Sequence, residues 1–253
     1  MSGGRGLPDF GAYIIGDEIL SGKRQDKHFT RIIEILKARG LGLSWCEYLG
    51  DDAARITARL QHSMASPDIV FSFGGIGATP DDYTRQCAAA AAGVEIERHP
   101  GAVAEIEAQF GERAYPKRVL MAEFPAGAEL IPNPVNRIPG FSVNNHHFMP
   151  GFPEMAWPMT EWVLDQRYSQ FFHQQPLAEA SILVFDAGES QLLDLMNGIV
   201  ERFPDLKLFS LPRLDQRRTI ELGVKGKPAL LPLAIAEIQA GVEAAGFSWQ
   251  PLS

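Results

Sequence analysis

Nine consecutive residues beginning at Gly74 read GGIGATPDD, a set of residue types suited to binding a phosphorylated ligand. Its three glycines allow positive φ and a close approach of the backbone, and a helix beginning behind them would offer unpaired N–H groups to an anion. Asp81 and Asp82 would repel a phosphate unless a cation lay between them. The stretch therefore predicts a phosphate cradle that works with a divalent metal.

Helix capping is the alternative explanation for part of this motif. Thr79 could be the N-cap of a helix, with Pro80 at its first position and Asp82 at its third, where a carboxylate favours the helix dipole. Capping alone does not require three glycines in the same turn. We therefore favour the binding interpretation, which needs a strand before the loop and a helix after it.

The flanking residues predict those elements. An apolar run over 68–73 is typical of a buried strand, and an alanine-rich run behind Thr79 and Pro80 favours a helix. Two further strand and helix pairs precede them, over 10–15 with 26–39 and over 41–49 with 50–64, where Asp51 and Asp52 suit a helix cap. Three such units in succession indicate a parallel sheet covered by helices.

Two more turns are expected to lie near the glycine loop. Asp17 and Glu18 follow the first strand directly, and the carboxyl ends of parallel strands are where open α/β sheets bind ligands, although a plain surface turn is equally compatible. A hairpin over 141–149 places His146 and His147 on opposite faces, so we expect no shared metal. The Pro150 and Gly151 turn that follows could close a pocket or act as a rigid connector.

A second domain is predicted beyond an irregular polar segment at 166–180. The order strand, helix, strand, strand, helix over 181–245 favours a small two-layer α+β module. We therefore expect domains at 1–168 and 176–253. Arg213, Arg217 and Arg218 cluster near a predicted hairpin, where a solvated turn is the favoured interpretation over an anion site.

Composition narrows the possible functions. The 253 residues carry a net charge of −8, which disfavours a general nucleic-acid binder. Cys46 and Cys87 lack metal-ligand spacing and are typical of buried thiols in a cytosolic protein. The first residues contain no apolar signal region and no stretch reaches membrane-spanning length. We expect a cytoplasmic protein with no membrane and no nucleic-acid partner.

Together these motifs resemble the molybdopterin-binding (MoaB/Mog-type) domain family, and within it the N-terminal part of the competence/damage-inducible protein A (CinA) group. The resemblance covers roughly residues 9–168. It is carried, in order, by the residues at 16–20 (GDEIL), 50–52 (GDD), 74–82 (GGIGATPDD) and 150–153 (PGFP).

The resemblance implies a three-layer α/β/α fold with a mostly parallel sheet, followed here by the small α+β domain. It implies a homo-oligomer, a dimer or a trimer, with a pocket formed by the three turns. Family members bind the phosphate of molybdopterin, and some adenylylate it with Mg²⁺. CinA-type members are associated with metal-dependent hydrolysis of ADP-ribose-like pyrophosphates, and related FAD synthase domains have a similar association. Many CinA proteins carry a further deamidase domain, and we expect no such activity here.

Three positions depart from the family pattern. Ala78 stands where a proline is common in CinA-type loops, and His28 stands where an asparagine is usual. Met155 occupies the position of the family's glutamate, with Glu154 one residue earlier.

Two functional hypotheses follow. In the first, the chain is a metal-dependent nucleotide pyrophosphatase in which Asp82 and Asp81 are catalytic, and Asp82 and Asp17 hold Mg²⁺, with Mn²⁺ or Co²⁺ as alternatives. In the second, the same cradle binds molybdopterin or a nucleotide without hydrolysis, or serves adenylyl transfer. The predicted ligand-binding residues are Gly16, Asp17, Glu18, Gly74, Gly75, Gly77, Thr79, Pro150 and Gly151.

Overall fold

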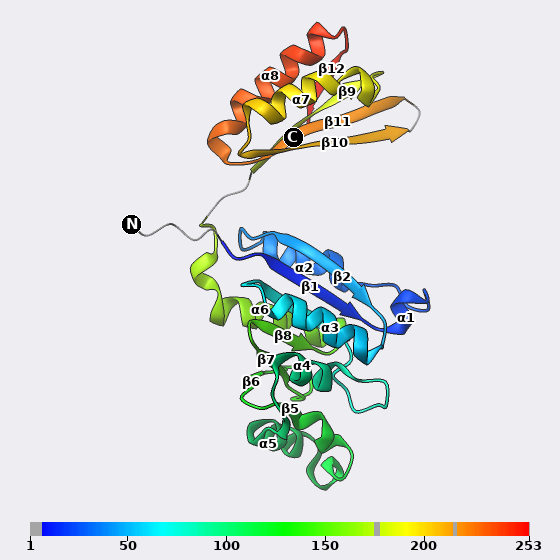
Figure 1. The fold of residues 1–253 in the computed structure, drawn as a ribbon, viewed down its shortest axis with the longest axis vertical. Helices are drawn as coiled ribbons and strands as arrows, with labels where there is room; N and C mark the ends of the chain where they lie inside the picture. Colours follow the sequence, from blue (N-terminus) through cyan, green and yellow to red (C-terminus); the bar gives the residue numbers. More distant parts are fainter. Residues whose placement is uncertain (1–6, 175–177, 215–216, 253) are drawn as a thin grey trace. The chain divides into compact units, whose positions relative to one another are not determined.

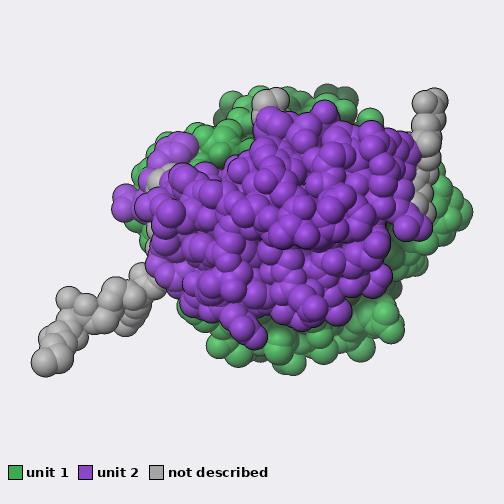
Figure 2. Space-filling view, turned by 90° about the horizontal axis from the view of Figure 1, so that it is seen from above, with its two compact units in different colours: residues 1–172 green, residues 173–253 purple. Residues whose placement is uncertain are grey.

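The chain forms two compact units, residues 1–172 and 173–253, in a computed structural model that describes residues 7–174, 178–214 and 217–252. Figure 1 shows the elements of both units, and Figure 2 colours the units separately. The first predicted domain ends at residue 168 and the second begins at residue 176, which lies outside the described residues.

The first unit is built on a six-stranded sheet in the order β2-β1-β3-β8-β7-β6. The first four of these strands are parallel to one another, β7 is antiparallel to β8, and β6 is antiparallel to β7. Every residue of β1 and β3 is buried, as expected of central strands covered on both faces. The strands are β1 (Phe10–Ile15), β2 (Leu43–Leu49), β3 (Ile69–Phe73), β8 (His146–Met149), β7 (Gly140–Val143) and β6 (Glu129–Ile131).

Helices cover both faces of this sheet, which confirms the predicted three-layer, mostly parallel fold (Figure 1). On one face α2 and α6 contribute buried side chains to a core with β1 and β3, and on the other α3, α4 and α5 form a second core. The helices are α1 (Asp17–Leu20), α2 (His28–Lys37), α3 (Ala53–Met64), α4 (Thr84–Ala92), α5 (Pro100–Phe110) and α6 (Pro153–Arg167). Shorter elements are β4 (Ile96–Arg98), β5 (Glu123–Pro125) and the 3-10 helices η1 (Gly111–Ala114), η2 (Arg118–Ala122) and η3 (Ser169–Phe171).

The apolar residues of α2 divide between the core and the surface. Ile32, Ile35 and Leu36 are buried, whereas Phe29 and Ile33, which share the helical spacing, are exposed. The hairpin predicted over 141–149 is confirmed, because β7 and β8 form an antiparallel pair and are joined by a turn at Asn144 and Asn145. Both asparagines have positive φ, the conformation that a two-residue hairpin turn requires.

The second unit is a four-stranded antiparallel sheet covered by two helices, a two-layer α+β module as predicted but with four strands instead of three. Its strand order is β10-β11-β9-β12. The final strand was not predicted, because it has four residues and contains Pro251, which is tolerated at a sheet edge. The elements are β9 (Ala178–Phe185), η4 (Glu189–Gln191), α7 (Leu193–Arg202), β10 (Leu206–Leu214), β11 (Arg218–Gly226), η5 (Pro228–Leu230), α8 (Leu231–Ala244) and β12 (Trp249–Leu252).

Among the described residues, no helix combines the length and the apolar character needed to span a bilayer.

Candidate functional site

Three turns meet at one edge of the first sheet because they follow three neighbouring parallel strands. Gly16 follows β1, Gly74 follows β3, and Pro150 follows β8. The backbone N–H of Gly74 donates to the carbonyl of Met149 at 3.0 Å. A Cβ on Gly151 would lie 3.4 Å from the Cα of Gly74, so these two turns are in contact.

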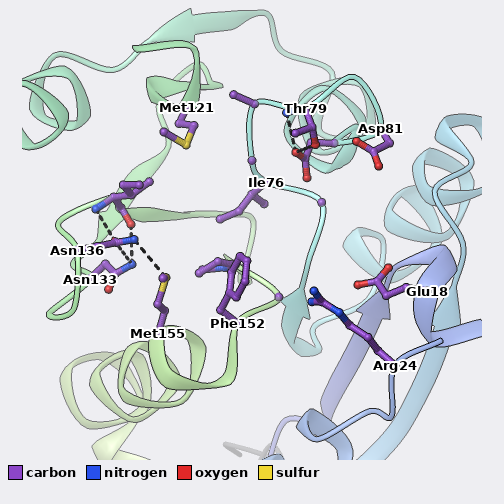
Figure 3. A pocket seen from close by; sticks show the side chains of 17 residues that line it. Glu18, Arg24, Ile76, Thr79, Asp81, Met121, Asn133, Asn136, Phe152 and Met155 are labelled. Carbon is purple, nitrogen blue, oxygen red and sulfur yellow. Dashed lines mark hydrogen bonds between the residues drawn. The ribbon is translucent and has the colours of Figure 1, made fainter. Parts of the chain in front are cut away.

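A pocket of about 560 Å³ opens between the turns, within the size range of small-molecule sites (Figure 3). An adjoining hollow of about 160 Å³ shares part of its wall. The predicted residues that line one or both are Gly16, Glu18, Gly74, Gly75, Gly77, Thr79, Asp81, Asp82, Pro150 and Gly151. Asp17 is the one predicted site residue that lines neither.

The glycine loop presents its backbone to the pocket. Gly74 and Gly75 have φ of 105° and 68°, and a Cβ at Gly75 would lie only 2.2 Å from the hydroxyl oxygen of Thr84. Within the described part of the chain, the backbone N–H groups of residues 75–78 donate to no protein acceptor. Four consecutive free donors beside a pocket are suited to binding an anion.

The helix after this loop begins later than the capping interpretation requires. Helix α4 starts at Thr84, and its N-cap position is Tyr83, so Thr79 is not the N-cap. The carboxylate of Asp82 nonetheless accepts from the backbone N–H of Thr79 at 2.9 Å and from its hydroxyl. Asp82 therefore holds the shape of the loop through one oxygen, and its other oxygen has no protein donor among the described residues.

Several carboxylates crowd this edge. Burial raises the pKa of Asp51, and the charges of Asp17, Glu18 and Asp81 raise it further against a hydrogen bond from the backbone of Asp17. The Thr79 side chain and the loop's own backbone lower the pKa of the exposed Asp81 carboxyl. This concentration of negative charge favours a bound cation.

Asp17 has a structural role in the first turn. Its Oδ1 accepts from the backbone N–H of Asp51 at 3.1 Å, and its own N–H donates to Oδ2 of Asp51 at 2.9 Å. Asp52, as predicted, caps α3 by accepting from Arg55 N. The placement thus does not support Asp17 as a metal ligand, whereas Glu18 lines both hollows.

The residues present fit a cation that the ligand itself helps to hold. Among the described residues, no group of three or more His, Cys, Asp or Glu side chains is arranged as a metal site. Mg²⁺ is commonly bound by one or two carboxylates together with substrate phosphates and water. Asp81, Asp82 and Glu18 suit that mode, in which the phosphate completes the coordination.

Arg24 is a lining residue that the sequence reasoning missed. It lies on the same side of the pocket as Glu18, Thr79 and Asp81 (Figure 3). Within the described residues its guanidinium makes no ion pair and no hydrogen bond. Its signal in the sequence is only a basic residue shortly after the first turn.

The opposite side of the pocket was also missed. Met121, Asn133, Asn136, Ile138, Phe152 and Met155 form it. Most of these residues come from segments without regular periodicity, so no pattern in the sequence places them beside the glycine loop.

His28 supports the third turn. Its Nε2 lies 3.2 Å from the carbonyl of Gly151, and its ring stacks on Phe73 with centroids 4.6 Å apart. Burial lowers the pKa of His28, so the neutral imidazole donates to this carbonyl. The residue that replaces the family's asparagine thus positions the turn.

His146 and His147 point to opposite faces, as predicted. His146 bonds Ser63, whereas His147 bonds Ser142 and the hydroxyl of Tyr168.

Comparisons with known proteins agree with this geometry. A family model described as a probable molybdopterin binding domain matches residues 11–170. A CinA-like protein of Citrifermentans bemidjiense is 30% identical over 91% of this chain and 57% of its own length. One from Geobacter sp. is 32% identical over 74% of this chain and 46% of its own. The chain thus spans about half the length of these relatives. The crystal structure of CinA from Thermoplasma acidophilum is 26% identical, with a TM-score of 0.57 over 62% of this chain and 97% of that one.

Proposed function

The chain belongs to the family of molybdopterin-binding (MoaB/Mog-type) domains, and we propose that it is a metal-dependent pyrophosphatase acting on ADP-ribose-like or FAD-like dinucleotides. The observation that carries the proposal is the row of free N–H groups at residues 75–78 beside Asp81 and Asp82 in one pocket. Donors and carboxylates side by side suit a phosphate that arrives with a cation.

Each residue has a definite role in this proposal. The N–H groups of 75–78 hold the phosphate that is not attacked, and Arg24 compensates part of its charge. The free oxygen of Asp82, assisted by Asp81 and Glu18, holds a divalent cation, with Mg²⁺ first and Mn²⁺ or Co²⁺ as alternatives. A bound cation would supply charge neutralisation and an activated water. Positioning and charge, rather than a protein nucleophile, then lower the barrier.

A second candidate is a module that binds molybdopterin or a nucleotide without hydrolysing it, or that serves adenylyl transfer. Its support is that one oxygen of Asp82 is already used by Thr79, which leaves fewer groups for metal chemistry. Under either candidate we propose a cytoplasmic homo-oligomer, a dimer or a trimer, which light scattering on the purified protein would measure.

The test is AMP release from ADP-ribose, FAD or NAD with each of the three cations. Asp82→Asn is the informative variant, because its amide oxygen can still accept from Thr79 while the charge is lost. We expect turnover by the wild type and a loss of at least about 100-fold in the variant. No turnover on any dinucleotide, together with calorimetric binding of molybdopterin, would instead establish the binding module.

A further inference from the structure

The pocket has two chemically different ends (Figure 3). Glu18, Arg24, Thr79 and Asp81 lie on one side, and the side chains of Met121, Asn133, Asn136 and Met155 gather on the other, with Ile76 between them. The charged end suits phosphate and a cation. The other end, with thioethers, an aromatic ring and amides, suits a flat and largely apolar group with few polar atoms.

The loop at 133–138 is held in shape by hydrogen bonds of its own side chains. Asn133 is 5% exposed, and its Nδ2 donates to Oδ1 of Asn136 at 2.8 Å and to the carbonyl of Ile138 at 3.0 Å. Its Oδ1 accepts from the backbone N–H of Val135 at 3.0 Å. The buried amide of Asn133 is therefore fully used in shaping the loop.

These bonds fix which way the Asn136 amide faces. Its Oδ1 accepts from Asn133 and, at 3.1 Å, from the backbone N–H of Ile138, so the oxygen must point into the loop. Its Nδ2 therefore points outward and reaches the sulfur of Met155 at 3.3 Å. A thioether is a weak acceptor and takes one of the two amide hydrogens. The second hydrogen has no acceptor within the described residues.

Phe152 provides a face against which a ring can stack. It stands at the N-cap of α6, lines the pocket and is 53% exposed. An exposed aromatic ring beside two methionines and an oriented amide donor matches a heteroaromatic ring with a hydrogen-bond acceptor on its edge.

We propose that the end formed by loop 133–138, Phe152 and Met155 binds a heteroaromatic ring, and that Nδ2 of Asn136 selects rings with an acceptor at their edge. Purine, pterin and flavin rings have such acceptors, whereas a ribose phosphate without a base has no heteroaromatic ring to place there. This inference rests on the proposed function, because the phosphate at the charged end defines where the ring lies.

The test compares phosphates with and without a ring. Calorimetry with Mg²⁺ would measure the binding of AMP, FMN and ribose 5-phosphate to the full chain. We expect at least one ring-bearing probe to bind about tenfold or more tightly than ribose 5-phosphate. In Asn136→Asp, one carboxylate oxygen can still accept from Asn133 and Ile138, while the other presents an acceptor to the ring. This variant should lose that preference and bind ribose 5-phosphate within about twofold of the wild type.

Two further variants keep the result interpretable. Asn145→Asp, at the exposed hairpin tip, adds the same charge away from the pocket and should leave all three affinities unchanged. Phe152→Leu should weaken the ring-bearing probes alone. The inference is wrong if the wild type binds all three probes equally, or if Asn136→Asp weakens them all by the same factor. Failure of every probe to bind with Mg²⁺ would overturn the proposed phosphate site and this inference with it.

Discussion

Gly75, like Gly74, is a residue of the pocket at which backbone conformation and packing both require glycine. Its φ is 68°, in the left-handed region, and a Cβ would lie 2.2 Å from Oγ1 of Thr84. That hydroxyl donates to the carbonyl of Gly74 at 3.1 Å, so it cannot turn away without leaving a buried acceptor unpaired.

Gly75→Ala is therefore expected to lower the free energy of unfolding more than the left-handed conformation alone would. Gly22→Ala is the matched control, because Gly22 has a φ of 71° and nothing within 4 Å of its Cβ position. We expect the free energy of unfolding, measured with urea, to fall by about 1 to 2 kcal/mol in the control and by at least about 1 kcal/mol more in Gly75→Ala. Equal losses in the two variants would mean that the contact with Thr84 does not constrain the loop.

The sequence identifies the site residues that directly follow strands, and it misses the site residues that tertiary contacts place beside them. Glu18, Asp81 and Asp82 are identified by their positions after two strands. The distinction between Glu18 and Asp17 depends on the bonds of Asp17 to Asp51, a residue 34 positions away. The roles of Arg24 and Asn136 likewise depend on tertiary contacts, which no local spacing encodes.

Helix α4 is tied to the glycine loop by a buried arginine. Arg85 is 3% exposed, and its guanidinium donates to the carbonyls of Leu120 and Glu123 and, at 2.8 Å, to that of Gly77. Burial lowers the pKa of Arg85, against the opposing charges of Glu123 and Asp82. One side chain thus joins the loop, the helix and the segment before β5.

Arg85→Lys is expected to be strongly destabilising although the charge remains. An ammonium group has no planar fork, so at least one of the three carbonyls loses its donor. We expect a loss of about 2 to 4 kcal/mol in urea unfolding. Arg98→Lys, at an exposed pair with Glu123, is the control and should change stability by less than about 0.5 kcal/mol. If Arg85→Lys were as stable as the wild type, the three hydrogen bonds of Arg85 would be dispensable for stability.

Most elements could be predicted from periodicity and turn residues, and the exceptions have physical causes. The start of α4 was misplaced because the backbone N–H of Thr84 bonds the carbonyl of Gly75, a contact within the loop that outweighs the local capping signal at Thr79. Strand β12 was missed because it exists through pairing with β9, more than 60 residues earlier in the chain.

Three buried histidines give the first unit a predictable response to pH. Burial lowers the pKa of His28, His146 and His147 below the ordinary value of 6.5. The unfolded chain therefore binds more protons than the folded one as the pH falls below 6.5, so stability is fully present above that pH and is lost below it.

For each histidine, the free energy of unfolding is expected to fall by up to about 1.4 kcal/mol for each unit by which the pH is lowered below 6.5. Urea unfolding between pH 7.5 and 5 would measure the slope. His28→Gln, whose amide nitrogen can reach the position of Nε2 and donate to Gly151, should have a slope that is shallower by the contribution of one proton. Unchanged stability between these pH values, in both proteins, would contradict the buried neutral state of these side chains.

The central claim for the molecule is that a phosphate binds the glycine loop with a cation between it and Asp82. Its most direct test is calorimetric binding of a non-hydrolysable ADP-ribose analogue, with Mg²⁺ and with a chelator, to the wild type and to Asp82→Asn. Our expectation is that Mg²⁺ tightens binding to the wild type by about tenfold or more and to the variant by less than about twofold. Equal affinity of the wild type with and without Mg²⁺ would contradict it.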